Sequence, residues 1–90
     1  MLRQQYLSRL RRFFPREIGK YRIRMHLTQE RLAEKLCMSA RSYIQLEHGE
    51  IGCSCLTVVL FLLLLTDDEI LQLLRGIRKE LQEAARHDAA

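Results

Sequence analysis

The sequence predicts a single all-α domain. Apolar residues recur at helical spacing along most of the chain, and no stretch of useful length alternates apolar with polar residues as a half-buried strand would. Only one Pro and four Gly interrupt the pattern. A chain of 90 residues can bury one compact core but is poorly suited to enclosing a deep substrate cavity. No nucleophile–base arrangement, phosphate-binding glycine loop or carboxylate pair stands out, so an enzyme is not expected.

Two helices are predicted in the first 25 residues. The first is a short basic, amphipathic helix over 2–14. Its apolar stripe comprises Tyr6, Leu7, Leu10, Phe13 and Phe14. Pro15 ends this segment and suits the first position of the next helix, which runs to about Met25. That helix is expected to stop near His26, because histidine tolerates a positive φ better than most residues.

Hydroxyl side chains mark the start of the remaining helices. Thr28, Ser39 and Ser54 are each predicted to accept a hydrogen bond from a backbone N–H in the first helical turn. The helix after Ser39 ends near Gly49, which is free to adopt the left-handed conformation. A T-x-x-E capping box starts the last helix at Thr66. That helix carries one apolar stripe, made of Ile70, Leu73, Leu74, Ile77 and Leu81.

The apolar run 55–65 is the longest in the chain, and its 11 residues fall short of the roughly 20 that a membrane span needs. A buried helix is expected there. Basic residues concentrate in the other half of the chain: residues 1–41 hold 11 Lys and Arg against 3 Asp and Glu, while 42–90 hold 4 against 8. An anionic partner, either nucleic acid or an acidic membrane surface, is therefore expected at the N-terminal half.

The three cysteines, Cys37, Cys53 and Cys55, are an odd number, and no cleavable apolar leader is recognised, so a cytoplasmic location is expected. A single C-x-C with His48 and Cys37 lacks the paired Cys-x-x-Cys units of structural zinc sites. We therefore expect no metal and no cofactor, with the cysteines serving as small buried apolar residues.

The stretch 18–49 carries a specific pattern at fixed spacing: Ile18-x-x-x-Arg22, then Leu27-Thr28-Gln29-Glu30-x-Leu32-Ala33-Glu34-Lys35-Leu36, then Met38-Ser39, then Leu46-Glu47-x-Gly49. This pattern resembles the phage-repressor/Cro-type (XRE) helix-turn-helix family. The resemblance implies a compact five-helix domain that binds double-stranded DNA, here with an additional short basic N-terminal helix. The expected organisation is a basic N-terminal segment over 1–14, a helix-turn-helix core over 15–66, and a C-terminal helix over 67–90 that completes the core or a dimer interface.

The resemblance also implies roles for individual residues. The exposed recognition positions, expected to contact bases, are Ala40, Arg41, Ile44 and Gln45. Arginine can bind guanine through two hydrogen bonds, which makes Arg41 the first choice for base recognition. The expected phosphate contacts are Thr28, Gln29, Ser39, Ser42, Arg16 and Lys20. Arg22 and Glu47 match the ion pair that joins the first helix to the end of the recognition helix, and Arg24 is expected on the exposed side.

Four departures from the family matter. Ile44 occupies a position that is commonly polar and DNA-facing, so two roles are open for it: contact with a thymine methyl group or with protein. Cys37 stands where a turn glycine is usual, at a cost of roughly 1 kcal/mol if the residue is left-handed. Tyr43 replaces a buried aliphatic residue and needs a partner for its hydroxyl. No Lys or Arg lies between residues 42 and 74, so the loop after the recognition helix lacks its usual basic residue. Phosphate contacts are therefore expected from the basic side chains of the N-terminal half, namely Arg9, Arg11, Arg12, Arg16, Lys20 and Arg24; the alternatives are a solvated helix face or a membrane-surface helix.

The fourth helix is apolar around most of its circumference, so it is either wholly buried or shared with another chain. A two-fold interface is expected through Leu56, Leu60, Leu63 and Leu74. The predicted function is a homodimeric transcriptional regulator, a repressor in its simplest form, that recognises a palindromic operator through the helix beginning at Ser39. The alternative is a protein-interaction module that retains the fold and binds a protein partner through its apolar fourth helix.

Overall fold

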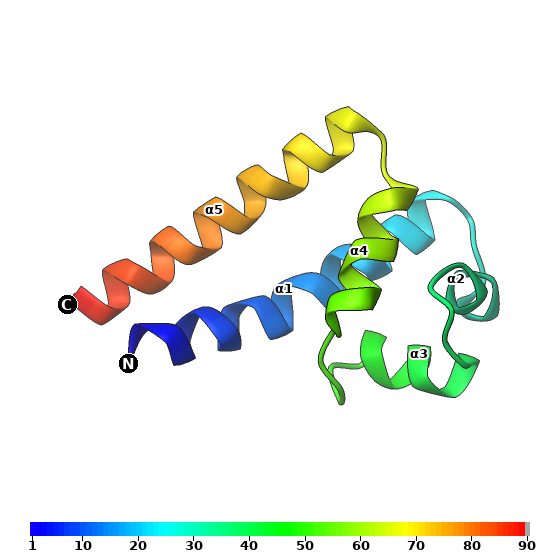
Figure 1. The fold of residues 1–90 in the computed structure, drawn as a ribbon, viewed down its shortest axis with the longest axis horizontal. Helices are drawn as coiled ribbons and strands as arrows, with labels where there is room; N and C mark the ends of the chain where they lie inside the picture. The colour runs from blue at the N-terminus through cyan, green and yellow to red at the C-terminus, as the bar shows by residue number, and fades with distance from the viewer. Residues whose placement is uncertain (90) are drawn as a thin grey trace.

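The computed structural model describes residues 1–89, and within them every regular element is an α-helix. The helices are α1 (Leu2–Arg24), α2 (Gln29–Lys35), α3 (Ala40–Glu47), α4 (Cys55–Leu64) and α5 (Asp67–Ala89). The all-α prediction is confirmed. α1 and α5 run antiparallel along the length of the molecule, so both termini lie at one end, while α2, α3 and α4 gather around the other end of α1 (Figure 1).

The predicted break at Pro15 is wrong, because α1 continues through this residue as one helix of 23 residues. Proline inside a helix removes one backbone hydrogen bond and typically costs about 3 kcal/mol. Packing against α5 offsets this cost on both sides of Pro15. Phe13 and Pro15 are buried, and Arg9 and Arg16 both form ion pairs with Glu80 of α5 at 3.3 and 3.5 Å.

The three predicted hydroxyl caps are confirmed. Thr28 accepts a hydrogen bond from the backbone N–H of the third helical residue at 3.1 Å, Ser39 does so at 3.1 Å, and Ser54 at 3.2 Å. The capping box of α5 is reciprocal: the Thr66 N–H donates to the Glu69 carboxylate at 2.8 Å, and the Glu69 N–H donates to the Thr66 hydroxyl at 3.2 Å. These local bonds fix where four of the helices begin.

Three left-handed residues end helices or turns at the predicted places. His26 has φ 56°, Cys37 has φ 55° and Gly49 has φ 79°. His26 follows α1, Cys37 lies between α2 and α3, and Gly49 follows α3. The Cys37 conformation is the one that favours glycine, so this turn is strained as expected.

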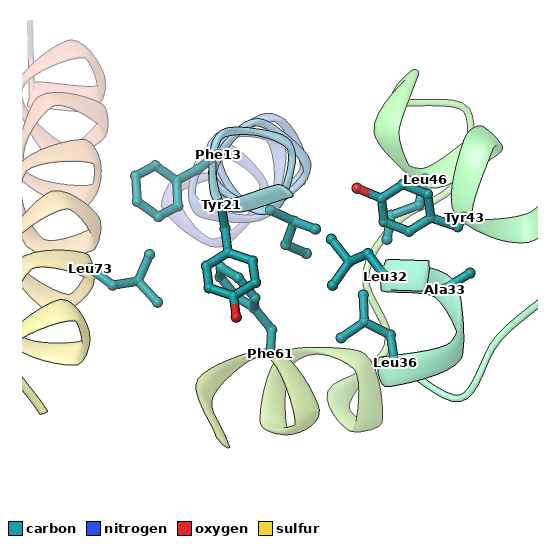
Figure 2. Close-up of a cluster of buried hydrophobic side chains, with 10 residues drawn as sticks. Phe13, Tyr21, Leu32, Ala33, Leu36, Tyr43, Leu46, Phe61 and Leu73 are labelled. Atoms are coloured by element: carbon teal, nitrogen blue, oxygen red, sulfur yellow. The ribbon is translucent and has the colours of Figure 1, made fainter. Parts of the chain in front are cut away.

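The core lies on two sides of α1 (Figure 2). On one side α1 meets α2 and α3, and on the other it meets α5, with α4 closing the space between. The largest fully buried side chains are Ile18, Leu32, Leu36, Tyr43, Leu46 and Phe61. Tyr21 packs edge-on against Phe61 with ring centroids 5.7 Å apart, and this contact joins α1 to α4. No helix in residues 1–89 is long and apolar enough to cross a membrane.

Candidate nucleic-acid interface

The α2–turn–α3 unit separates a buried from an exposed side. Tyr43 and Leu46 of α3 are buried in the core. Arg41 and Ile44 lie on the solvent side, and Ile44 is 37% exposed. No ion pair engages Arg41 within residues 1–89, so its guanidinium retains its hydrogen-bond donors for a ligand. The other expected recognition residues, Ala40 and Gln45, are half-buried.

Two serines at the start of α3 organise its N-terminus. The Ser39 hydroxyl accepts a hydrogen bond from the Ser42 N–H and donates one to the Ser42 hydroxyl at 3.0 Å. These bonds fix the first turn of α3, in which Arg41 lies. Ser39 is exposed and Ser42 is half-buried, so the pair lies at the surface beside the expected recognition residues.

Arg22 of α1 fixes the other end of α3. Its Nε and Nη2 donate hydrogen bonds of 2.9 Å to the two carboxylate oxygens of Glu47, and its Nη1 donates to the Leu27 carbonyl at 3.1 Å. Both charged side chains are about one-fifth exposed. The hydrogen bonds of Arg22 hold the pKa of Glu47 below its ordinary value, with smaller contributions from Tyr43 and Gln29. Gln29, expected at a phosphate, is therefore next to this pair.

The Tyr43 hydroxyl is buried near the same pair and has no hydrogen-bond partner within residues 1–89. Figure 2 shows its oxygen directed towards α1. Burial is the main cause that raises the pKa of Tyr43. The hydroxyl therefore stays neutral, and the hydrogen-bond partner expected for it is not found within the part of the chain that the structure describes.

The structure does not bring Arg16 and Lys20 together with α2 and α3. Arg16 pairs with Glu80 of α5. Lys20 pairs with Glu17 at 3.5 Å and lines an open groove of about 340 Å³ between α1, α4 and α5. Arg24, expected on the exposed side, is half-exposed but forms an ion pair with Glu69 and lies over the Tyr21 ring, 5.4 Å from its centroid. Arg16 and Arg24 therefore form ion pairs between α1 and α5, and Lys20 forms one within α1.

The helix α4 leaves part of its apolar surface uncovered. Leu56, Val59 and Leu63 are 61%, 45% and 75% exposed, and their spacing of three and four places them on one face of α4. Leu74 of α5 is 47% exposed, whereas Leu60 is half-buried against the core. Val59 was not among the residues predicted for this face, although its spacing of three from Leu56 and four from Leu63 identifies it from the sequence.

No group of three or more His, Cys, Asp or Glu side chains within residues 1–89 lies close enough to hold a metal ion. Cys37 and Cys55 are exposed, so the expectation of small buried cysteines is wrong for these two. Cys53 is half-buried, and burial raises the pKa of its thiol to about 11. The Cys53 thiol therefore stays protonated at neutral pH.

A short capped helix, a left-handed turn and a second capped helix with an exposed arginine define a helix-turn-helix protein of the DNA-binding class. Residues 18–52 match the helix-turn-helix family model, and this match supports the XRE-type resemblance and a role in DNA-binding transcription regulation. The resemblance found in the sequence is confirmed. No curated protein and no solved structure gives a further match.

Proposed function

We propose that this protein is a homodimeric repressor that binds a two-fold-symmetric DNA operator. The observation that carries the proposal is the exposed, unpaired Arg41 in the first turn of α3. With α3 in the major groove, Arg41 contacts guanine, and Ala40, Ile44 and Gln45 contact the neighbouring bases. Ile44 offers an apolar surface to a thymine methyl group.

Phosphate contacts hold α3 in register without reading sequence. Thr28 and Gln29 at the start of α2 bind one phosphate, and Ser39 and Ser42 bind another. All four are polar side chains at the exposed or half-buried ends of α2 and α3.

The exposed face of α4 supports the homodimer. A stable interface buries about 800 Å² of each partner, which is about one-eighth of the 6386 Å² surface of this chain. Leu56, Val59 and Leu63 supply its apolar centre, and Leu74 supplies its edge. A second copy is the favoured occupant because two recognition helices about 34 Å apart bind DNA in two successive major grooves. Such a dimer represses by occupying a promoter that overlaps its operator.

Selection of bound sequences from a random duplex library tests the proposal. We expect a two-fold-symmetric motif whose half-site centres are about one helical turn apart. Binding to that motif should weaken steeply as salt rises, because bound phosphates release counterions. An asymmetric single half-site would overturn the homodimer. Failure to bind duplex DNA at low salt would overturn the whole proposal and favour a protein-interaction module that uses the same α4 face.

A further inference from the structure

An arginine of α1 lies beside the loop that follows α3. A Cβ atom built on Gly52 would lie 4.0 Å from both Cγ and Nε of Arg11. Gly52 belongs to the segment 48–54, which joins α3 to α4 and turns at the same edge of the molecule as α3 (Figure 1). A side chain from the N-terminal part of α1 therefore reaches the loop after the recognition helix.

This loop has no Lys or Arg of its own. It carries Glu50, and no Lys or Arg occurs anywhere between residues 42 and 74. Arg11 is thus the cation that the fold brings to this place from another element.

Arg11 differs from four of the other arginines along α1, which form ion pairs. Arg3 and Arg12 also have no ion pair within residues 1–89, but only Arg11 lies within 4.0 Å of the Cβ position of Gly52. Arg9 and Arg16 pair with Glu80, Arg22 pairs with Glu47, and Arg24 pairs with Glu69. Arg11 is exposed, and within residues 1–89 no carboxylate pairs with it. Its guanidinium is therefore available to an external anion.

The continuity of α1 fixes Arg11 relative to α3. Arg11 precedes Arg22 by 11 residues, which is about three helical turns, so both lie on one face of α1 about 16 Å apart. The two hydrogen bonds between Arg22 and Glu47 hold that face of α1 against the end of α3. A break at Pro15 would have left the direction of Arg11 unconstrained; the unbroken helix holds it beside the loop.

We propose that Arg11 binds a backbone phosphate of the DNA next to the α3–α4 loop, supplying from α1 the positive charge that this loop lacks. The ligand is the phosphodiester group of duplex DNA, so the contact adds affinity and register and not base preference. This inference rests on the proposed function, because α3 must enter the major groove to bring the loop near the backbone.

The test compares wild type, Arg11→Ala, Arg11→Lys and Arg75→Ala on the selected operator between 50 and 200 mM salt. Arg75 of α5 is the matched control, since it is exposed and has no ion pair within residues 1–89. Each lost phosphate contact lowers the slope of log K against log salt by about 0.9, so a dimer of Arg11→Ala should lose about 1.8. Arg11→Lys should keep most of the slope, and Arg75→Ala should match wild type.

Ethylation of single phosphates supplies a second measurement. One phosphate in each half-site should weaken wild-type binding when ethylated and have no effect on Arg11→Ala. Wild-type slope and affinity in Arg11→Ala would overturn this inference while leaving the proposed function intact. A wild-type protein that binds no duplex DNA would instead overturn the proposed function, and the two failures are thus distinguishable. Unchanged helicity and melting temperature of Arg11→Ala would show that lost binding does not come from unfolding.

Discussion

Arg22 and Glu47 are joined by two hydrogen bonds of 2.9 Å, although 25 residues separate them along the chain. The pair connects the face of α1 to the end of α3, and the third donor of Arg22 holds the Leu27 carbonyl in the turn before α2. One arginine therefore fixes the relative position of three helices. Its partners would be left without their charged donor if the guanidinium were removed.

We expect Arg22→Ala to destabilise the fold by about 2–3 kcal/mol, because the partly buried Glu47 carboxylate would lose both hydrogen bonds. Thermal unfolding measures the effect. Arg75→Ala is the control and should melt within error of wild type. Arg24→Ala is a poor control, because Arg24 has its own ion pair with Glu69. Equal melting temperatures for Arg22→Ala and Arg75→Ala would show that the pair contributes nothing.

The same pair predicts a dependence of stability on pH. Arg22 holds the pKa of Glu47 below its ordinary value of about 4.5 in the folded protein. A carboxylate of this kind stabilises the fold fully above its unfolded-state pKa, and this stabilisation is lost as the pH falls through the folded-state pKa. Glu47→Gln should therefore weaken the loss of stability on acidification below about pH 4.5.

Urea denaturation at pH 7, 5, 4 and 3 measures this dependence. Glu30→Gln is the control, since Glu30 is exposed and has no ion pair within residues 1–89. An acid dependence of Glu47→Gln as steep as that of wild type would contradict the assignment.

The left-handed turn offers a stabilising substitution. Cys37 has φ 55° and an exposed side chain, so Cys37→Gly relieves strain without removing a buried contact. The gain should be about 0.5–1 kcal/mol, because the greater freedom of glycine in the unfolded chain offsets part of the relief. Gly49→Ala, at φ 79°, should have the opposite effect. Chemical denaturation of both variants gives the sign, and a loss of stability in Cys37→Gly would mean that the thiol makes a stabilising contact.

Features that depend on near neighbours in sequence were predictable. A hydroxyl cap involves residues three apart, and the left-handed conformations of His26, Cys37 and Gly49 follow from local helix ends. The continuity of α1 through Pro15 was not predictable, because the compensation comes from α5, more than 60 residues away. The cost of a proline inside a helix applies to an isolated helix, and packing against a second helix can offset it.

The candidate site also combines features that local sequence predicts with features that depend on tertiary contacts. Helical spacing places Arg41 and Ile44 on the exposed side of α3, as expected. Charge counting alone could not separate Arg11 from Arg16, since both are basic residues of one helix. The two arginines differ in their neighbours: Arg16 forms an ion pair with Glu80 of α5, whereas Arg11 lies beside Gly52. Such pairings depend on tertiary structure.

Base recognition by Arg41 is tested by substitution. Arg41→Ala should weaken operator binding by about 1–3 kcal/mol and relax the preference at one base pair in each half-site. Stability should not change, because the side chain is exposed and has no ion pair within residues 1–89. Binding to operators with every base at that position measures the preference. An equal loss of affinity on every sequence would make Arg41 a phosphate contact.

The residues of the α4 face differ in how deeply they are buried, so only some of them can be substituted without weakening the fold. Leu60 packs against the core, so an aspartate there would weaken the monomer as well as any interface. Leu63 is 75% exposed, so Leu63→Asp removes apolar contact area from the surface alone. We expect this variant to keep its fold and become monomeric, because a buried interface cannot easily accept an unpaired carboxylate.

Ile23→Asp is the matched control, since Ile23 is 67% exposed on α1 and lies outside the proposed interface. Sedimentation equilibrium at tens of micromolar should show a dimer for wild type and for Ile23→Asp, and a monomer for Leu63→Asp. A dimeric Leu63→Asp would place the interface elsewhere, and a monomeric wild type would leave this face to a different protein.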